Sequence, residues 1–459
     1  MEGTRLSRMI AFFIALVYFT FIASFLVNLV KWKTPRTSMP APKPHGSSCP
    51  ILISDQTITP LNNTKHLLVS AYMDQRKKEF DIRIIGIFKR DSIQPLHCLF
   101  CCVSSLSETT PATVLPHSDH FGFPFGATDV VCRIPPKCDD ATHVTLVTEA
   151  KVEERFNHIW LPIRNKKEER RFNFTVCISS LFGNYSNVLQ YAQTLEMYRL
   201  LGVDRVVIYN TSCSADLDRL LQSYSKEGFV EIVPWPIDKH LKPSRGWKFP
   251  EHGGDLHYFG QLVKLNECIY RSMERSRYVL LNDIDEIITP YQHDNLISLM
   301  RNLEKSHKNV GVFLIENHIF PTEHIEPSHR FHLRQWARIP TVNILEHIHR
   351  EDPDRHVYHP YKMIVQPRSV VQTSVHEVLQ IFGEQYHVPS EVCRIIHVRG
   401  ALRKSLTLEQ LHEDRRLWDF QEKLIPNVDM VLKRAGLLAP EDNRTTDNRG
   451  TDQSNKRGG

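Results

Sequence analysis

The sequence predicts an α/β fold in which a largely parallel sheet, covered by helices, follows a small β-rich module and an N-terminal transmembrane helix. Three patterns predict it. A long uncharged apolar run lies near the amino terminus, short β-like runs fill residues 51–165, and strands alternate with helices from residue 171 onward. The 459 residues suffice for more than one domain and for at least one sizeable core.

The composition is ordinary for a folded protein, with 41% hydrophobic and 24% charged residues. The net charge of +5 is small for this length, and basic residues are interleaved with acidic ones. This charge pattern argues against nucleic-acid binding.

The apolar run covers residues 9–30 and contains no charged side chain. A helix of that length measures about 33 Å, against a hydrocarbon core of about 30 Å. A cleaved signal peptide is the alternative, but its apolar region is usually shorter, about 7–15 residues, and ends in small residues. We therefore expect a retained anchor over residues 9–30, preceded by a cytoplasmic tail of residues 1–8.

Sequons and cysteines favour a lumenal body after the anchor. Asn-X-Ser/Thr sequons begin at Asn62, Asn173, Asn184, Asn210 and Asn443. An oxidising compartment permits disulfides among the ten cysteines, and we expect them mainly between Cys98 and Cys138. Together these features predict a single-pass type II protein of the secretory pathway.

The segments around the folded body are predicted from composition. Residues 31–50 are rich in proline among Ser, Thr and Lys, which predicts an extended stem. Residues 436–459 are polar and predict a disordered tail. Between them, residues 51–165 show β-like runs with turns and little helical periodicity, which predicts a sandwich-like module.

From residue 171 the pattern changes to alternating strands and helices, within a domain expected over residues 166–435. We expect strands at 172–179, 205–209, 229–233 and 278–281, and helices starting at Ser186, at Ser214 and at about Asp255. Near-continuous apolar strands alternating with helices predict a parallel sheet buried on both faces. Ligands of such sheets bind at the carboxyl ends of the strands.

Two carboxylates follow the last of these strands. Asp283 and Asp285 are separated by one residue and therefore point to the same side of an extended or turning backbone. Two carboxylates held this close repel each other, so a bound cation that neutralises them is favoured. Mn²⁺ or Mg²⁺ would do so and would also bridge the two phosphates of a nucleotide diphosphate. A bare D-x-D sequence is more often a solvated turn. Its position after a buried strand in a lumenal protein favours the metal site here.

Residues 171 to about 404 closely resemble glycosyltransferase family 92, once catalogued as a domain of unknown function. The resemblance rests on residues 174–183, 198–204, 252–261, 277–286, 375–376 and 397–399. It covers about half of the chain, and the upstream β-rich region also looks like that of family members. It implies a GT-A-type (Rossmann-like) glycosyltransferase domain, a nucleotide-sugar donor and a Golgi setting.

The members that this chain resembles are β1,4-galactosyltransferases that use UDP-galactose and a divalent metal. The resemblance therefore implies an inverting Golgi enzyme that transfers galactose to a terminal galactose or fucose of a glycoprotein or glycolipid glycan. Such an enzyme uses a general base. Three alternatives stay open: an inactive glycan-binding protein on this fold, a transferase with another UDP-sugar, and a metal-dependent hydrolase. A homodimer is compatible with each.

Asp283 and Asp285 are the expected metal residues, with Asp285 the more direct ligand. As in many GT-A enzymes, a histidine from the second half would complete the site, and His397 and His376 are the candidates. His397 is favoured because it follows an apolar pair and precedes Arg399. The chain has 24 histidines, so most must be ordinary surface or interior residues.

The resemblance also implies the donor-binding residues. The expected set is Leu181, Gly183, Asp255, Gln261, Asp283 and Arg399. Gly183 would let the backbone approach the uridine, although a plain turn is the alternative. Arg399 would pair with the diphosphate, and Asp255 is equally suited to capping a helix.

Two glutamates are candidates for the general base. Glu377 follows His376, and Glu316 lies near a strand end. Taken singly, each is more often structural than catalytic. Lys362 would meet phosphate or acceptor, or would be solvated.

Overall fold

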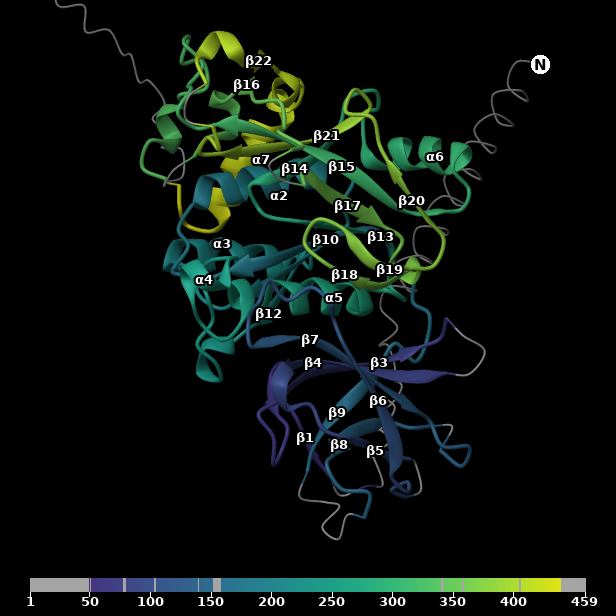
Figure 1. Ribbon diagram of the computed structural model, residues 1–459. Coiled ribbons are helices and arrows are strands. Elements are labelled where there is room, and N and C mark those ends of the chain that lie inside the picture. The colour runs from purple at the N-terminus through teal and green to yellow at the C-terminus, as the bar shows by residue number, and fades with distance from the viewer. Residues whose placement is uncertain are drawn as a thin grey trace, which may run out of the picture. The chain divides into compact units, whose positions relative to one another are not determined.

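The computed structural model describes residues 49, 51–76, 80–102, 105–138, 140–151, 158–339, 342–356, 359–403 and 406–438 (Figure 1). The predicted cytoplasmic tail and transmembrane helix lie outside these residues, as do most of the stem and the C-terminal tail. No helix within the described ranges is long and apolar enough to cross a membrane.

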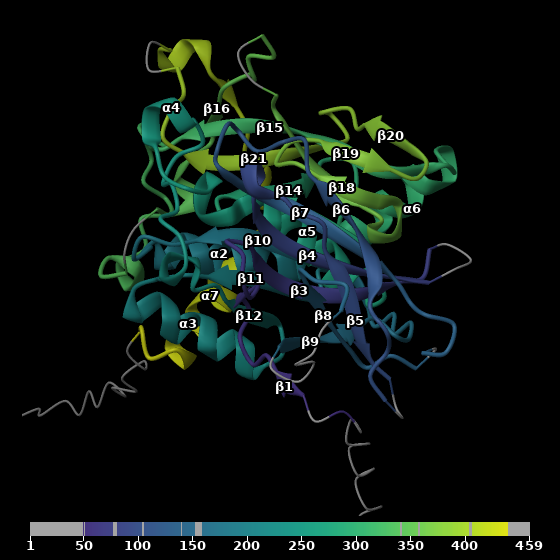
Figure 2. The ribbon, with the colours of Figure 1, turned by 60° about the horizontal axis from the view of Figure 1, so that its bottom comes forward.

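Nine strands form the β-rich module. They are β1 (Leu52–Ile53), β2 (Thr59–Pro60), β3 (Leu67–Asp74), β4 (Asp81–Lys89), β5 (His97–Cys101), β6 (Thr110–Pro116), β7 (Phe125–Arg133), β8 (His143–Val147) and β9 (Ile159–Arg164). Their order is β1-β9-β8-β5-β6-β7-β4-β3-β2, and β9 also pairs with β3. Figure 2 shows β3, β4 and β7 as neighbours.

The β9–β3 pairing closes seven strands into a ring, so the sandwich-like prediction for this module is corrected. The closing contact joins residues 71–72 to residues 163–164, which run parallel. Strand alternation predicts each strand from local sequence. It does not predict closure, because this contact joins segments about ninety residues apart.

Two predicted boundaries also shift. Cys49, placed in the stem, is buried and forms a disulfide with Cys101. Leu437 and Leu438, placed in the tail, pack against the hydrophobic core. The folded body therefore extends over both boundaries, because a disulfide and an apolar contact hold these short segments.

The second sheet is the predicted α/β sheet. Its strands are β10 (Phe172–Leu181), β11 (Arg205–Asn210), β12 (Val230–Pro234), β13 (Ser276–Asn282), β14 (Glu286–Pro290), β15 (Val310–Pro321), β17 (Tyr361–Val365), β20 (Glu384–His387) and β21 (Cys393–Arg399). The order is β12-β11-β10-β13-β17-β15-β21-β14, with β20 beside β15. Only β14 and β17 run against the others. The carboxyl ends of the remaining strands thus share one edge. Two short ladders pair β16 (His349–Arg350) with β22 (His412–Glu413) and β18 (Val370–Thr373) with β19 (Val378–Ile381).

Helices cover both faces of this sheet. They are α2 (Val188–Leu200), α3 (Ala215–Lys226), α5 (Gln261–Ser272) and α6 (Leu296–Ser306). The helix α7 (Gln421–Arg434) packs on α2 and α3, and the short α4 (Phe249–His252) has no buried residue. Successive strand residues face different cores: Val206 and Ile208 pack with α2 and α3, whereas Val207 packs with α5. This confirms the predicted burial of both faces.

The predicted helix starts differ in accuracy. Ser214 caps α3 as predicted, its hydroxyl accepting from a backbone amide, and the N-cap of α2 is Asn187, one residue after the predicted cap Ser186. The helix predicted from Asp255 begins only at Gln261. The three residues before it, Tyr258, Phe259 and Gly260, have positive φ values of 40°, 56° and 82°. A right-handed helix cannot run through such residues.

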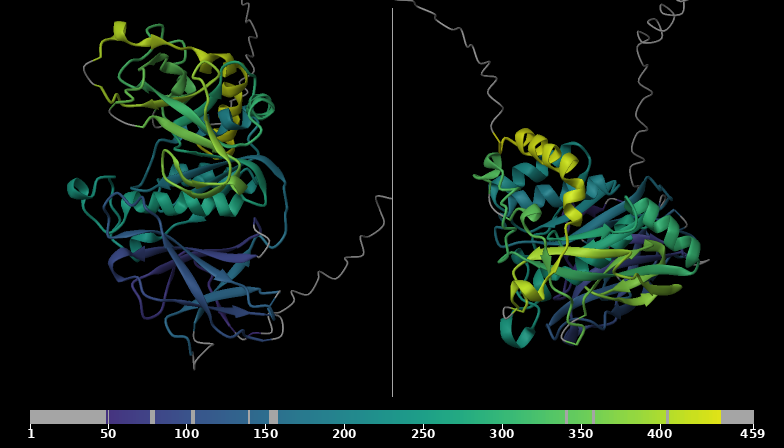
Figure 3. Two further views of the ribbon diagram at one scale, coloured as in Figure 1. Left: turned by 45° about the vertical axis from the view of Figure 1, so that its right-hand side comes forward. Right: turned by 90° about the horizontal axis from the view of Figure 1, so that it is seen from above.

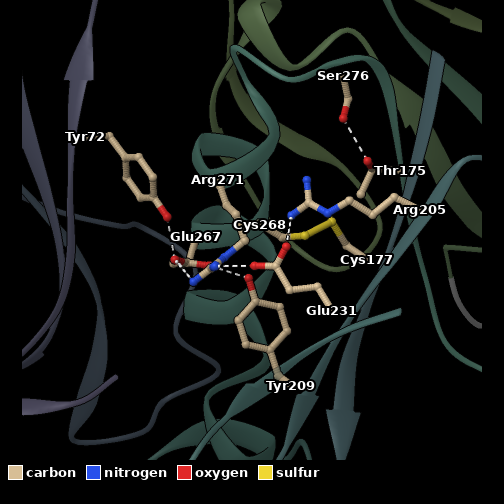
Figure 4. Close-up of a disulfide and its surroundings, with 10 residues drawn as sticks. All are labelled: Tyr72, Thr175, Cys177, Arg205, Tyr209, Glu231, Glu267, Cys268, Arg271 and Ser276. Atoms are coloured by element: carbon tan, nitrogen blue, oxygen red, sulfur yellow. Dashed lines mark hydrogen bonds and ion pairs between the residues drawn. A yellow bond between two sulfur atoms is a disulfide. The ribbon is translucent and has the colours of Figure 1, made fainter. Parts of the chain in front are cut away.

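Disulfides occur within the module and within the α/β domain. Two of them, Cys98–Cys132 and Cys102–Cys138, lie in the predicted group, and the others are Cys49–Cys101 and Cys177–Cys268. The last one attaches α5 to β10 (Figure 4). Cys213 and Cys393 are free thiols.

Helix α5 lies between the α/β sheet and the module, as Figure 3 shows. Tyr72 of the module and Tyr209 of β11 both donate to the carboxylate of Glu267 on α5 (Figure 4). Arg271, one turn later, pairs with Glu267 and with Glu231 of β12. The same helix therefore joins the module to the α/β sheet.

Candidate active site

The two aspartates lie in a tight turn between β13 and β14. Asn282 Nδ2 donates to the carbonyl of Glu286 at 2.8 Å, and the buried Tyr198 hydroxyl donates to the same oxygen at 2.9 Å. The Glu286 carboxylate accepts from the backbone amide of Asp283 at 2.9 Å. Glu286 therefore braces the turn from inside, and the backbone is held before any ligand arrives.

Asp283 is engaged by other parts of the protein. Its Oδ2 accepts from Lys362 Nζ at 2.9 Å, and its Oδ1 accepts from Gln261 Nε2 at 3.3 Å. Lys362 is buried on β17 and also lies 3.4 Å from the Glu286 carboxylate. Burial alone would lower the pKa of Lys362, but the two carboxylates outweigh it and raise that pKa. The charge of Asp283 is thus largely neutralised within the chain.

Asp285 faces a histidine. His397 Nε2 lies 3.1 Å from Asp285 Oδ2, while His397 Nδ1 lies 3.2 Å from the side-chain oxygen of Asn317. The Asn317 amide donates to Glu286 at 2.9 Å, which fixes its orientation. Burial would lower the pKa of His397, yet the adjacent Asp285 carboxylate raises it. Sequence reasoning named both members of this pair.

The geometry suits two ligands of one divalent ion. Adjacent ligands on an octahedral ion with bonds of about 2.1 Å lie roughly 3 Å apart, as Asp285 and His397 do. In a neutral His397 whose Nδ1 donates to Asn317, Nε2 would have the lone pair that binds a metal. Across the described residues, no group of three or more His, Cys, Asp or Glu side chains is arranged to hold a metal. An ion here would take its other ligands from phosphate and water, as Mg²⁺ commonly does.

His376, the alternative histidine ligand, has another partner. Its Nδ1 donates to the carbonyl of Tyr361 at 2.9 Å. Burial, with a further contribution from the Lys362 charge, lowers the pKa of His376 to about 4. It borders the site as a neutral side chain, whereas His397 contacts Asp285 directly.

The loop after β10 provides an open turn at the same edge. Leu181 is buried, and its carbonyl accepts from Thr211. Gly183 has φ +71°, and no atom lies within 4 Å of where a β-carbon would stand. Phe182 stacks on Phe259 with ring centroids 4.1 Å apart. A planar ligand can therefore approach this backbone closely.

Two phenols lie close enough to the aspartates for the carboxylate charges to shift their pKa values. Burial raises the pKa of both Tyr185 and Tyr258, and the carboxylates of Asp283 and Asp285 raise it further. Tyr258 has the left-handed backbone described above. Such strain persists only where surrounding structure enforces it, and it concentrates at functional sites.

The remaining donor-site candidates divide into two kinds. Arg399 is exposed at the end of β21, and its charge lowers the pKa of Tyr258 and opposes the rise at His397. It therefore lies near the aspartate turn. Asp255 instead accepts from the backbone amide of Lys242 at 2.8 Å, and its carbonyl accepts from Phe125. These contacts close its own loop onto the module.

The two base candidates have different surroundings. Glu316 is buried on β15 and pairs with His318 at 3.1 Å and with Arg355. Burial would raise the pKa of Glu316, but these two partners lower it. Glu377 is exposed between β18 and β19. Neither carboxylate lies in the hydrogen-bonded cluster around Asp283 and Asp285.

Sequence reasoning missed several side chains that shape this site. Tyr198 and Tyr258 lie within segments that carry the family resemblance but were given no role in the site, and no pattern marks Asn317. Lys264 is fully buried, and its amine has no hydrogen-bond partner among the described residues. Burial lowers the pKa of Lys264 to about 7, although nearby Asp283 favours its charge. Its position three residues after Gln261, on the same helix face, was the available signal.

Curated relatives include galactosyltransferases. The β-1,4-galactosyltransferase galt-1 of Caenorhabditis elegans is 20% identical over 231 residues, covering 48% of this chain and 50% of that protein. The galactan β-1,4-galactosyltransferase GALS3 of Arabidopsis thaliana is 22% identical over 257 residues, covering 55% and 46%. The chain thus spans about half the length of these relatives.

Likeness to solved structures is weak. Glucosyl-3-phosphoglycerate synthase from Mycobacterium tuberculosis aligns with a TM-score of 0.24 and 11% identity, covering 59% of this chain and 82% of that one. The family comparison is decisive, because the model of glycosyltransferase family 92 matches residues 172–438, more than half of the chain. This protein belongs to glycosyltransferase family 92.

Proposed function

We propose that this protein is a metal-dependent galactosyltransferase that uses UDP-galactose and forms a β1,4 linkage to a terminal galactose or fucose. The Asp285–His397 pair carries the proposal, because two ligand atoms lie 3.1 Å apart at the carboxyl edge of the parallel sheet. The activities after which the two relatives are named, β-1,4-galactosyltransferase and galactan β-1,4-galactosyltransferase, support the donor sugar and the linkage. The proposal includes a GT-A-type fold for the α/β domain.

Mn²⁺ or Mg²⁺ would be held by Asp285 and His397. Bound there, the ion supplies a counter-charge for the diphosphate that leaves with uridine. Asp283, already neutralised by Lys362, serves instead to position Gln261 and the turn. Arg399 extends from the same edge and pairs with phosphate.

Transfer with inversion is a single displacement. The oxygen of an acceptor hydroxyl attacks the anomeric carbon, the bond from that carbon to the diphosphate oxygen breaks, and UDP departs with the electron pair. The hydroxyl proton passes to a carboxylate. Glu316 and Glu377 are the candidates. The partners of Glu316 lower its pKa, which makes this carboxylate a weaker base than it would be without them.

We further propose a Golgi membrane protein of type II with a lumenal catalytic domain. Of the sequon asparagines that the structure describes, Asn62, Asn173 and Asn184 are exposed. The four disulfides also suit an oxidising compartment. Peptide mapping of protein from a secretory host should find glycan on at least one of these asparagines. Complete absence of glycan would contradict the topology.

The function is tested with purified full-length protein, UDP-galactose, Mn²⁺ and glycans ending in galactose or fucose. The expected result is metal-dependent UDP release together with a mass gain of one hexose on the glycan. Transfer from a different UDP-sugar would mean that this sugar, and not UDP-galactose, is the donor. UDP release without a mass gain on the glycan would indicate hydrolysis of the donor. Glycan binding without any turnover would favour the inactive glycan-binding alternative.

A further inference from the structure

A cavity of about 480 Å³ lies where β9 of the module meets the C-terminal end of α5. Helix α5 contacts the aspartate turn at its other end, through Gln261. Arg271, which lines the cavity, stands ten residues after Gln261, so about 15 Å of helix separates the two. The cavity is therefore distinct from the candidate active site.

The lining of the cavity is mainly basic. Its five cationic side chains come from the end of β9, from the linker after it, and from the end of α5 and the residues that follow: Arg164, Lys166, Lys167, Arg271 and Arg275. The two acidic side chains of the lining are paired elsewhere. Glu169 pairs with Arg171 at 2.9 Å, and Glu274 pairs with Arg368. Neither glutamate is thus available to neutralise the basic side chains.

The guanidinium groups of the lining differ in how well they are paired. Arg271 lies between Glu267 and Glu231 and pairs closely with both, as Figure 4 shows. Arg164 lies 3.8 Å from Glu267, and Arg275 lies 3.7 Å from Glu231. These two distances exceed the length of a hydrogen bond. Arg164 and Arg275 therefore keep donors for a ligand.

The two lysines add uncompensated charge. Lys166 and Lys167 are exposed, and neither forms an ion pair within 4 Å among the residues that the structure describes. Glu231, one of the two carboxylates near the arginines, is also shared with Arg205 at 2.7 Å. The cavity thus has an excess of positive charge. A concave surface lined by one sign of charge concentrates ligands of the opposite sign.

The cavity suits a ligand larger than a free anion. Its volume lies within the roughly 300–1,000 Å³ of small-molecule sites. Ile163 and the methylene stems of the arginines and lysines add apolar surface between the charged groups. A pyranose ring with a carboxylate or sulfate presents matching surfaces, because its C–H groups contact the stems and its anionic group accepts from a guanidinium.

The same lining argues against a lipid chain or an apolar peptide. The exposed large apolar side chains among the described residues, which include Leu52, Phe80 and Trp247, all lie outside the cavity. An acyl chain would find no apolar surface there to cover it. A sugar ring needs only the polar groups and short stems that are present.

We propose that this cavity is a second glycan-binding site, separate from the active edge, and that it binds a sugar carrying a carboxylate or a sulfate. The site goes beyond the proposed transferase function and does not require it. Under that function, it would hold an acidic sugar of the acceptor glycan away from the terminus that receives galactose.

The test measures binding by saturation-transfer NMR with full-length protein, without donor or metal. The ligands are methyl β-D-galactopyranoside, its uronic acid, its 6-sulfate, and inorganic sulfate. At least one of the two acidic sugars should bind about tenfold more tightly than the neutral sugar. Inorganic sulfate should bind more weakly than the acidic sugars because it does not contact the apolar stems. Rising salt should weaken the binding of the acidic sugars.

Two variants assign this binding to the cavity. Lys166→Glu together with Lys167→Glu should raise the Kd of the acidic sugar about tenfold or more, since two attractive charges become repulsive. Arg275→Gln should raise it several-fold and does not depend on the folding of the first variant. Lys305→Glu together with Lys308→Glu is the matched control. It makes the same change in net charge on exposed residues at the end of α6 and should leave the Kd unchanged.

Three results would overturn the proposal. They are equal binding of neutral and acidic sugars, inorganic sulfate binding as tightly as the sulfated sugar, and a Kd for the acidic sugar that neither cavity variant changes. Because binding is measured without donor or metal, failure of the transferase assay leaves this test intact. Loss of acidic-sugar binding in both cavity variants, with none in the control, would uphold the site whether or not transfer occurs.

Discussion

At the residue scale, the two aspartates of the turn have different partners and therefore different roles. Lys362 holds Asp283 at 2.9 Å, whereas Asp285 lies 3.1 Å from Nε2 of His397. Glu286 lies beneath both and is buried. A buried carboxylate of this kind is stable only because Lys362 and Asn317 contact it.

Asp285→Asn should reduce transfer by more than about 100-fold while leaving folding intact, because the amide is a poor ligand for a hard cation and the side chain is only half-buried. UDP release assays and thermal unfolding measure the two effects. Asp294→Asn, the same change on an exposed loop, is the control and should keep full activity. A fully active Asp285→Asn protein would remove the metal proposal.

Asn317→Ala should weaken Mn²⁺ affinity by about 10- to 100-fold, the usual effect of losing a residue that orients a ligand. Asn317 accepts from His397 and donates to Glu286, so its loss frees the imidazole to rotate. The check is the Mn²⁺ concentration for half-maximal activity. Unchanged metal dependence would mean that His397 is oriented by other contacts.

At the element scale, α5 connects the site to the rest of the fold. Its first residue, Gln261, contacts Asp283, and Lys264 lies buried one turn later. Further along, Cys268 is bonded to Cys177 of β10. A shift of this helix would therefore move the donor side of the site as well as the sheet.

Replacing Cys177 and Cys268 together by alanine should lower the free energy of unfolding by about 2–4 kcal/mol. The bond closes a loop with a sequence separation of 91 residues, which restricts the unfolded chain. Urea unfolding measures the change. Cys213→Ala, which removes a free thiol, is the matched control and should have a much smaller effect. Equal stability of the double variant and the control would contradict this role.

At the scale of the whole molecule, the module and the α/β sheet share one hydrophobic cluster around α5. Within it, Glu267 is fully buried and joins Tyr72 of the module to Tyr209 of the sheet. Burial alone would raise the pKa of Glu267, but Arg271 and the two phenols lower it to about 2. This carboxylate therefore stays ionised inside the protein.

The sign of the pH dependence follows from that lowered pKa. The carboxylate stabilises the fold above its ordinary pKa of 4.5 and loses this contribution as the pH falls toward 2. Glu267→Gln should thus cost about 3 kcal/mol at pH 7, and the difference from wild type should shrink between pH 4.5 and pH 2. Denaturant unfolding across this range measures it, with Tyr72→Phe as a control that removes one hydrogen bond. If the difference in unfolding free energy between wild type and Glu267→Gln does not change with pH, it does not come from the lowered pKa of Glu267.

Sequence patterns were informative where the deciding physics is local. Apolar runs and caps predicted β10 to β13 and the start of α3, because burial on both faces and helix capping are determined by residues close together in the sequence. The D-x-D turn was found for the same reason. The start of α5 was missed because left-handed backbone at Tyr258 and Phe259 has no local signature.

What the sequence determined by itself is the chemistry available at the edge of the sheet: two aspartates after a buried strand and a histidine after another. Only the tertiary structure decided how they are used. Lys362 and Asn317 come from strands far along the chain, and their contacts with Asp283 and His397 exist because β17 and β15 pair beside β13. Those pairings are long-range, so no local pattern separates the aspartate that is neutralised by lysine from the one that faces histidine.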